Sequence, residues 1–119
     1  MRELIKETLQ SCQEYMPVLI SAVGDAAFLL QSGDEARGVQ LVIKIIDGLQ
    51  WVIDAVQGVQ QNGFSLNIDI TDIAVHFQQL ESALTIRDYV LVADLFEYEI
   101  APTLQIWLDK VNTALKDVI

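Results

Sequence analysis

The segment from Glu35 to Gln60 reads EARGVQLVIKIIDGLQWVIDAVQGVQ and has the strongest helical pattern in the chain. Its apolar residues recur at steps of three and four, which places them along one side of an α-helix. They span an arc of about 140°, so we expect this helix to be the central one and to contact at least two neighbours. The apolar positions are Leu41, Val42, Ile45, Ile46, Leu49, Val52, Ile53, Val56 and Val59.

Glycines mark both ends and the middle of this helix. Gly33 and Gly63 can adopt the left-handed conformation that ends a helix, and Asp34 can cap the helix that follows. Gly48, in the middle, costs about 1 kcal/mol relative to alanine. The exception would be a neighbour that packs closely over Gly48.

The same periodicity predicts three more helices, over about Glu3–Gln31, Asp72–Leu84 and Arg87–Asp117. Pro17 and Pro102 lie inside the first and the last of these. Because proline lacks the N–H that an interior helical position donates, we expect a kink or a break at each.

Between the second and third helices, Phe64–Ile70 alternates apolar with polar residues. Alternation is typical of a strand, but a lone strand has no partner, so we expect an extended strap across the end of the helices. Asp69 or Thr71 is expected to cap the third helix. The fold class predicted for residues 1–119 is a single all-α domain, an antiparallel four-helix bundle.

Composition narrows the function classes. The 119 residues are 52% hydrophobic, which argues against a disordered chain. The net charge of −10 argues against nucleic-acid binding, because phosphates require clustered basic residues. Charged residues interrupt the most apolar segment, 40–59, and the N-terminus, so we expect neither a membrane span nor a signal peptide. The single cysteine, Cys12, suits a reducing cytoplasm. We therefore expect a cytoplasmic protein.

Residues that could support catalysis or metal binding are few. His76 is the only histidine and has no glutamate three residues before it; we expect it to pair with Asp72 at most. Cys12 falls on the apolar face of the first helix, where a free cysteine is usually inert. No glycine-rich phosphate loop occurs. We expect no enzyme, no metal, no cofactor and no small-molecule substrate.

Glu97 is the one carboxylate that projects onto an apolar helical face. An unpaired buried carboxylate is costly. Pro102 could rotate the helix and leave Glu97 at a boundary, or Glu97 could bond Tyr15, Tyr89 or Tyr98. The functional alternative is a polar specificity point in a groove, or a small-ligand site that Glu97 forms with a tyrosine.

Two sets of apolar residues lie on faces expected to be polar. On the second helix, Trp51 projects into the polar stripe with Ile43 at its edge; either this is a protein-binding anchor, or the helical phase is wrong, or the strap covers the indole. On the last helix, Leu91, Leu95, Pro102 and Ile106 form a second stripe with Tyr98 beside it. The predicted partner-binding residues are Ile43, Trp51, Leu91, Leu95, Tyr98 and Ile106.

These stripes favour a protein that binds another protein or itself. An acidic surface repels membranes and nucleic acids, and amphipathic helices suit a helix-in-groove contact. The first hypothesis is a non-enzymatic chaperone or adaptor that holds a helical segment of a partner. The alternative is an obligate homodimer, with no other ligand, that buries the stripe of the last helix against its own copy.

The turn Gly33-Asp34-Glu35-Ala36 and the pattern Leu41–Ile46 with Leu49 resemble the flagellar export chaperone family, which holds flagellin before secretion. The resemblance implies a small bacterial cytoplasmic helical bundle that binds an unfolded or helical segment of a secreted protein. The segment Asp88–Glu99 is similar to small uncharacterised bacterial helical proteins.

Overall fold

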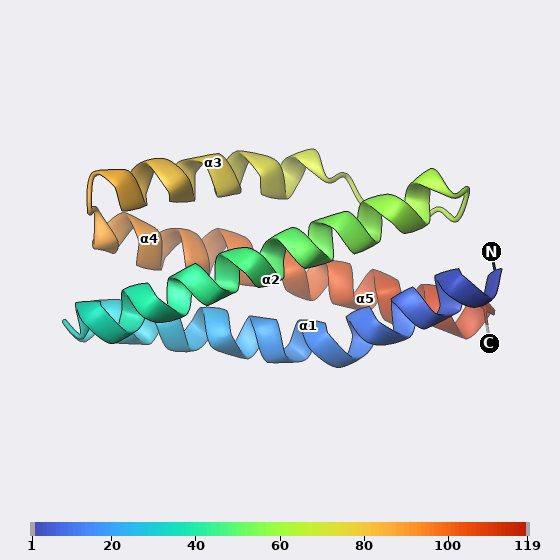
Figure 1. Cartoon of the computed structure of the whole chain (residues 1–119), viewed down its shortest axis with the longest axis horizontal. Coiled ribbons are helices and arrows are strands. Elements are labelled where there is room, and N and C mark those ends of the chain that lie inside the picture. The colour runs from blue at the N-terminus through green and yellow to red at the C-terminus, as the bar shows by residue number, and fades with distance from the viewer. Residues whose placement is uncertain (1, 119) are drawn as a thin grey trace.

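All regular elements between residues 2 and 118, the residues that this computed structural model describes, are helices (Figure 1). The all-α class is therefore confirmed, while both end residues of the predicted domain, 1 and 119, lie outside the described residues. The elements are α1 (Arg2–Gln31), α2 (Glu35–Gln61), α3 (Thr71–Thr85), α4 (Tyr89–Leu95), the π-helical turn η1 (Phe96–Ile100) and α5 (Ala101–Val118). Since α4, η1 and α5 follow one another without a break, they form one long helical rod.

The first helix, not the second, is at the centre of the packing. α1 contacts α2, α4, η1 and α5, whereas α2 packs chiefly against α1. α3 lies against α4 and η1 (Figure 1). The expectation of a central second helix is therefore wrong. One margin of its wide apolar arc, at Ile46 and Ile53, is only half-buried, so the arc was wider than the surface that α2 buries fully.

Buried apolar side chains from all the helices and from the strap form one core. Fully burying a side chain such as Phe96 or Leu49 contributes about 1.5–3 kcal/mol. No polar or charged side chain in the described part of the chain is buried, so apolar burial holds the helices together. Within residues 2–118, none of the helices is both long and apolar enough to cross a membrane.

Left-handed residues end α1 and α2, as the glycine positions predicted. Gly33 has φ 83°, and the N–H of Asp34 donates to the Leu29 carbonyl at 2.9 Å. Gly63 has φ 86° and ends α2 in the same way. Asp34 is the N-cap residue of α2, at the position predicted, but its side chain makes no capping hydrogen bond and pairs instead with Arg37 at 3.3 Å.

The segment 64–70 is a non-helical strap, as its alternation predicted, but it is not extended throughout, because Asn67 has a left-handed φ of 56° and Ile70 has helical dihedral angles. Leu66 and Ile68 are buried, while the polar residues between and beside them are exposed. The side-chain amide of Gln60 accepts from the Ile68 N–H and donates to the Ile68 carbonyl, both at 3.1 Å. Gln60 thereby supplies the hydrogen bonds that a neighbouring strand would otherwise give.

The start of α3 differs slightly from the expected cap. Ile70 is the N-cap residue and makes no side-chain cap. Asp69, one residue earlier, accepts from the Thr71 N–H at 3.0 Å and the Thr71 hydroxyl at 2.6 Å. Asp69 therefore stabilises the turn that leads into α3 rather than the helix end itself.

The two prolines are accommodated in different ways. α1 continues through Pro17 without a break, so a split there is wrong. Pro102 is the second residue of α5, and the π-helical turn η1 that precedes α5 contains one extra residue. One residue corresponds to about 100° of helical rotation, so residues after η1 face differently from where a regular helix would place them.

Candidate functional site

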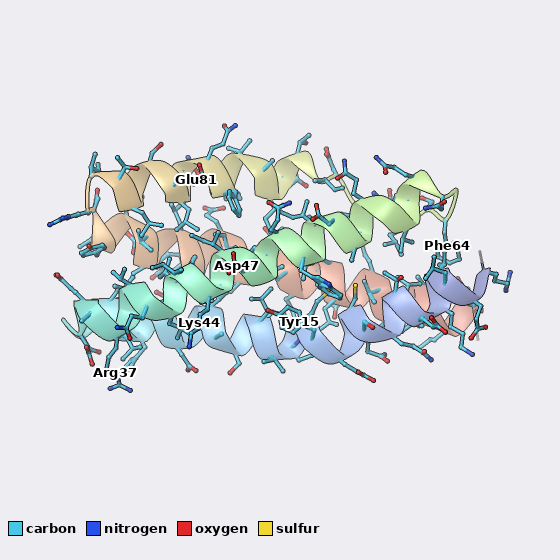
Figure 2. All side chains as sticks on the ribbon, viewed as in Figure 1. Tyr15, Arg37, Lys44, Asp47, Phe64 and Glu81 are labelled. Carbon is cyan, nitrogen blue, oxygen red and sulfur yellow. The ribbon has the colours of Figure 1, made fainter. Side chains whose placement is uncertain are left out.

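A groove of about 650 Å³ runs between α1 and α2. Its apolar walls come from Tyr15 and Val18 on α1 and from Gly48 and Trp51 on α2. Val18 is 62% exposed and Trp51 42% exposed, so both present apolar surface to solvent. Figure 2 shows Tyr15 on α1 at its boundary with α2. Exposed apolar surface of this kind in a concave site is typical of a protein-binding surface.

An aromatic pair forms the centre of this groove. The rings of Tyr15 and Trp51 meet edge to face, with centroids 5.5 Å apart and an interplanar angle of 79°. The indole is therefore held in place from one side while much of it remains open. The strap does not line this groove, so the alternative in which it covers Trp51 finds no support.

Gly48 is the position that lets Tyr15 lie against α2. A Cβ atom at Gly48 would collide with the Tyr15 hydroxyl and lie 3.0 Å from Leu19 Cδ1. Tyr15 is therefore a neighbour that packs closely over Gly48. A larger residue at 48 would push the ring outward and fill the groove.

A second hollow, of about 430 Å³, continues from the groove along the same two helices. It shares Ser11 and Trp51 with the groove and extends to Leu4 and Ala55. Trp51 therefore stands between two adjoining depressions. Together they form one surface, which we call the α1–α2 groove.

Charged side chains border the α1–α2 groove. Four carboxylates line it, and Lys44 is the one cation among its lining residues (Figure 2 labels Lys44 and Asp47). The carboxylates are those of Glu7, Glu14, Asp47 and Asp54. The two ion pairs within residues 2–118, Arg37–Asp34 and His76–Glu99, lie elsewhere. None of the four groove carboxylates is therefore neutralised by a basic side chain.

The structure does not gather the predicted partner residues onto one surface. Trp51 lines the α1–α2 groove, whereas Ile106 lines a separate hollow of about 470 Å³ with the strap. Ile43, Leu91 and Tyr98 are exposed, and none of them lines the α1–α2 groove.

Leu95 corrects the predicted stripe on the last helix. Its side chain is only 5% exposed and belongs to the core, so it is not available to a partner. Leu91 on the same segment is 39% exposed, and Pro102 and Ile106 are exposed beyond η1. The extra residue in the π-helical turn rotates Pro102 and Ile106 away from Leu95, which breaks the stripe.

The sequence analysis missed the α1 side of the groove. Val18 and Leu4 were not singled out, and Tyr15 was considered only as a partner for Glu97. The signal that could have found this side was Gly48, one turn before Trp51 on the same face of α2. A glycine beside an exposed tryptophan indicates a close helix approach next to an anchor.

Two polar side chains that the sequence analysis considered for chemistry, Glu97 and His76, contact neighbouring side chains. Glu97 is exposed and accepts a hydrogen bond from Gln31 Nε2 at 2.8 Å, not from a tyrosine. His76 contacts Glu99 at 3.4 Å and Gln79 at 3.2 Å, so the expected pairing with Asp72 is wrong. No cluster of three or more potential metal ligands occurs within residues 2–118.

Cys12 lies in the core on α1 and is 1% exposed. Burial raises the pKa of its thiol to about 11, because the low-dielectric core disfavours the thiolate. At neutral pH the side chain is a protonated thiol that packs as a small apolar group.

Comparison with known proteins identifies a family but does not give a function. No curated protein matches the chain, and no solved structure does. The sequence pattern of one protein family matches residues 7–110 of the chain. This range includes both sides of the groove around Trp51. The chain belongs to the family described as a domain of unknown function (DUF8042).

Proposed function

We propose that this chain is a non-enzymatic protein-binding module, a cytoplasmic chaperone or adaptor whose α1–α2 groove holds a helical segment of a partner. The observation that carries the proposal is the exposed Trp51 in a groove with Tyr15 and Val18. Tryptophan and tyrosine are the residues most enriched among the anchors of protein interfaces.

The dimensions of the groove suit a helix. On α1 its lining extends from Leu4 to Val18, which corresponds to about 21 Å along the helix axis. A partner helix of about 14 residues has the same length. Such a helix would place one side chain on Trp51 and apolar side chains along the two hollows, at the spacing of successive turns.

The arrangement of the helices and the cellular location are also part of this proposal. We expect the four helical rods to form an antiparallel bundle, with bends at Pro17 and Pro102. The cytoplasmic location rests on the single cysteine, Cys12, which is a buried thiol. The chaperone form of the proposal rests on the resemblance to the flagellar export chaperone family.

Displayed random peptides, each about 14 residues long, test the docking proposal. They are selected on the wild-type protein while an excess of the Trp51→Ala variant competes for peptides that bind elsewhere. We expect amphipathic peptides that bind the wild type and lose at least tenfold in affinity to Trp51→Ala. The control is Val75→Ala, which truncates an exposed apolar residue on α3 outside the groove and should leave affinity unchanged.

The same selection can overturn the proposal. If no peptide prefers the wild type over Trp51→Ala, the groove is not a docking site. The homodimer alternative is tested by the solution mass over a wide dilution range. A dimer that survives dilution and shields Trp51 from a soluble fluorescence quencher would mean that the groove is occupied by a second copy.

A further inference from the structure

The charges around the α1–α2 groove are unbalanced. Its lining residues include four carboxylates but only one ammonium group, that of Lys44. Because no basic side chain of the described residues lies within salt-bridge distance of these carboxylates, their charge is available to a ligand. A partner with basic residues would therefore gain Coulomb attraction here, whereas an acidic partner would be repelled.

Two of the carboxylates flank the exposed indole. Asp47 lies four residues before Trp51 and Asp54 three residues after it, so both are surface neighbours of Trp51 on α2. Glu14 approaches the same region from α1, next to Tyr15. The centre of the groove is thus an open aromatic surface with acidic groups on either side.

This combination favours a cationic side chain over a purely apolar one. A cation over an indole ring is attracted to the negative face of the ring, and arginine makes such contacts most often. Arginine can also donate to a nearby carboxylate while its plane stacks on the ring. An aromatic surface without carboxylates would show no such preference.

On the basis of the proposed function, we infer that the partner segment is a basic amphipathic helix, with one arginine or lysine docked on Trp51 between Asp47 and Asp54. The apolar residues of that helix lie along Val18 and Leu4, and its other basic residues face Glu7 and Glu14. Lys44, which also lines the groove, disfavours a further basic residue of the partner beside it.

The groove-dependent peptides from the display selection are the probe. We expect them to be enriched in arginine and lysine at one position relative to the unselected library. In a synthetic copy of the strongest binder, replacement of that arginine by citrulline removes the charge and keeps the shape. We expect this change to weaken binding at least tenfold, and raised salt to weaken the arginine peptide more than the citrulline peptide.

Matched variants of the protein locate the effect. Asp47→Asn and Asp54→Asn should each weaken the arginine peptide several-fold and leave the citrulline peptide unchanged. The control is Glu81→Gln, which removes an exposed charge on α3 away from the groove (Figure 2). It changes the net charge of the protein equally and should have little effect on either peptide.

The possible failures are distinguishable. If groove-dependent peptides are found but are not basic, or if citrulline replaces arginine without loss, the inference is wrong while the docking proposal stands. Equal weakening by Glu81→Gln and Asp47→Asn would show that only the overall charge matters, which would also overturn the docked cation. Absence of any groove-dependent peptide overturns both proposals.

Discussion

Replacing Gly48 by alanine tests the packing that forms the groove. Alanine is the better helix former by about 1 kcal/mol, so propensity alone predicts that Gly48→Ala stabilises α2. The added methyl group would, however, collide with the Tyr15 hydroxyl and lie 3.0 Å from Leu19 Cδ1. The two effects oppose each other, and the magnitudes decide the outcome.

Gly24 provides the matched control, because it lies inside α1 and a Cβ there would meet nothing within 4 Å. Gly24→Ala should raise the free energy of unfolding by about 1 kcal/mol, or the melting temperature by about 4 °C for a chain of this size. Overpacking costs about 1–3 kcal/mol, so Gly48→Ala should be less stable than Gly24→Ala by that amount.

Urea unfolding followed by far-UV circular dichroism measures these differences without relying on Trp51 fluorescence. The added variant Tyr15→Phe removes the hydroxyl that collides with the new methyl group. We therefore expect Gly48→Ala combined with Tyr15→Phe to recover most of the lost stability, which is a favourable coupling in a double-mutant cycle. If Gly48→Ala stabilises the protein as much as Gly24→Ala does, or if the two changes are additive, Tyr15 does not pack over Gly48.

Three further predictions concern the core, the thiol and the turn before α3. Leu95→Ala should lower the free energy of unfolding by about 2–5 kcal/mol, and Leu91→Ala by less than about 1 kcal/mol; equal urea midpoints would contradict the broken stripe. Cys12 should react with a disulfide reagent far more slowly in the native protein than in urea, because at pH 8 only about 0.1% of a thiol with a pKa of about 11 is ionised. The hydrogen bonds from Thr71 lower the pKa of Asp69, so Asp69 stabilises the fold at neutral pH and loses this effect as the pH falls through the lowered pKa. In an NMR titration Thr71→Val should raise the pKa of Asp69, and an unchanged value would show that the hydroxyl bond is unimportant.

Much of the fold could be predicted from local patterns. Apolar residues at helical spacing located the helices, and Gly33 and Gly63 located two of the turns, because each signal depends on a few neighbouring residues. The strap was predictable for the same reason. The conformation of Arg87 could not be predicted. Its φ is 57° at the end of α3, and a left-handed φ is uncommon for arginine.

The π-helical turn is the feature that sequence reasoning could not supply. Pro102 indicates that the helix is disturbed, but a kink, a break or an inserted residue can each accommodate a residue that has no N–H to donate. These alternatives give different helical phases after Ile100. The prediction of one stripe through Leu95 and Ile106 assumed a regular helix and therefore missed the change of face after Ile100. The burial of Leu95, which lies before the turn, depends on what packs against α4.

The groove was only half predictable because it is a property of two helices. Trp51 was visible as an apolar residue on a polar stripe of one helix. Whether it forms a site depends on what α1 places beside it, and that requires the register between α1 and α2. Gly48 carries this register, since a glycine opposite Tyr15 allows the ring to lie inward and leaves the indole open at its side. With any larger residue at position 48, the ring would be pushed outward over the groove, and Trp51 would lose the surface that we propose it offers to a partner.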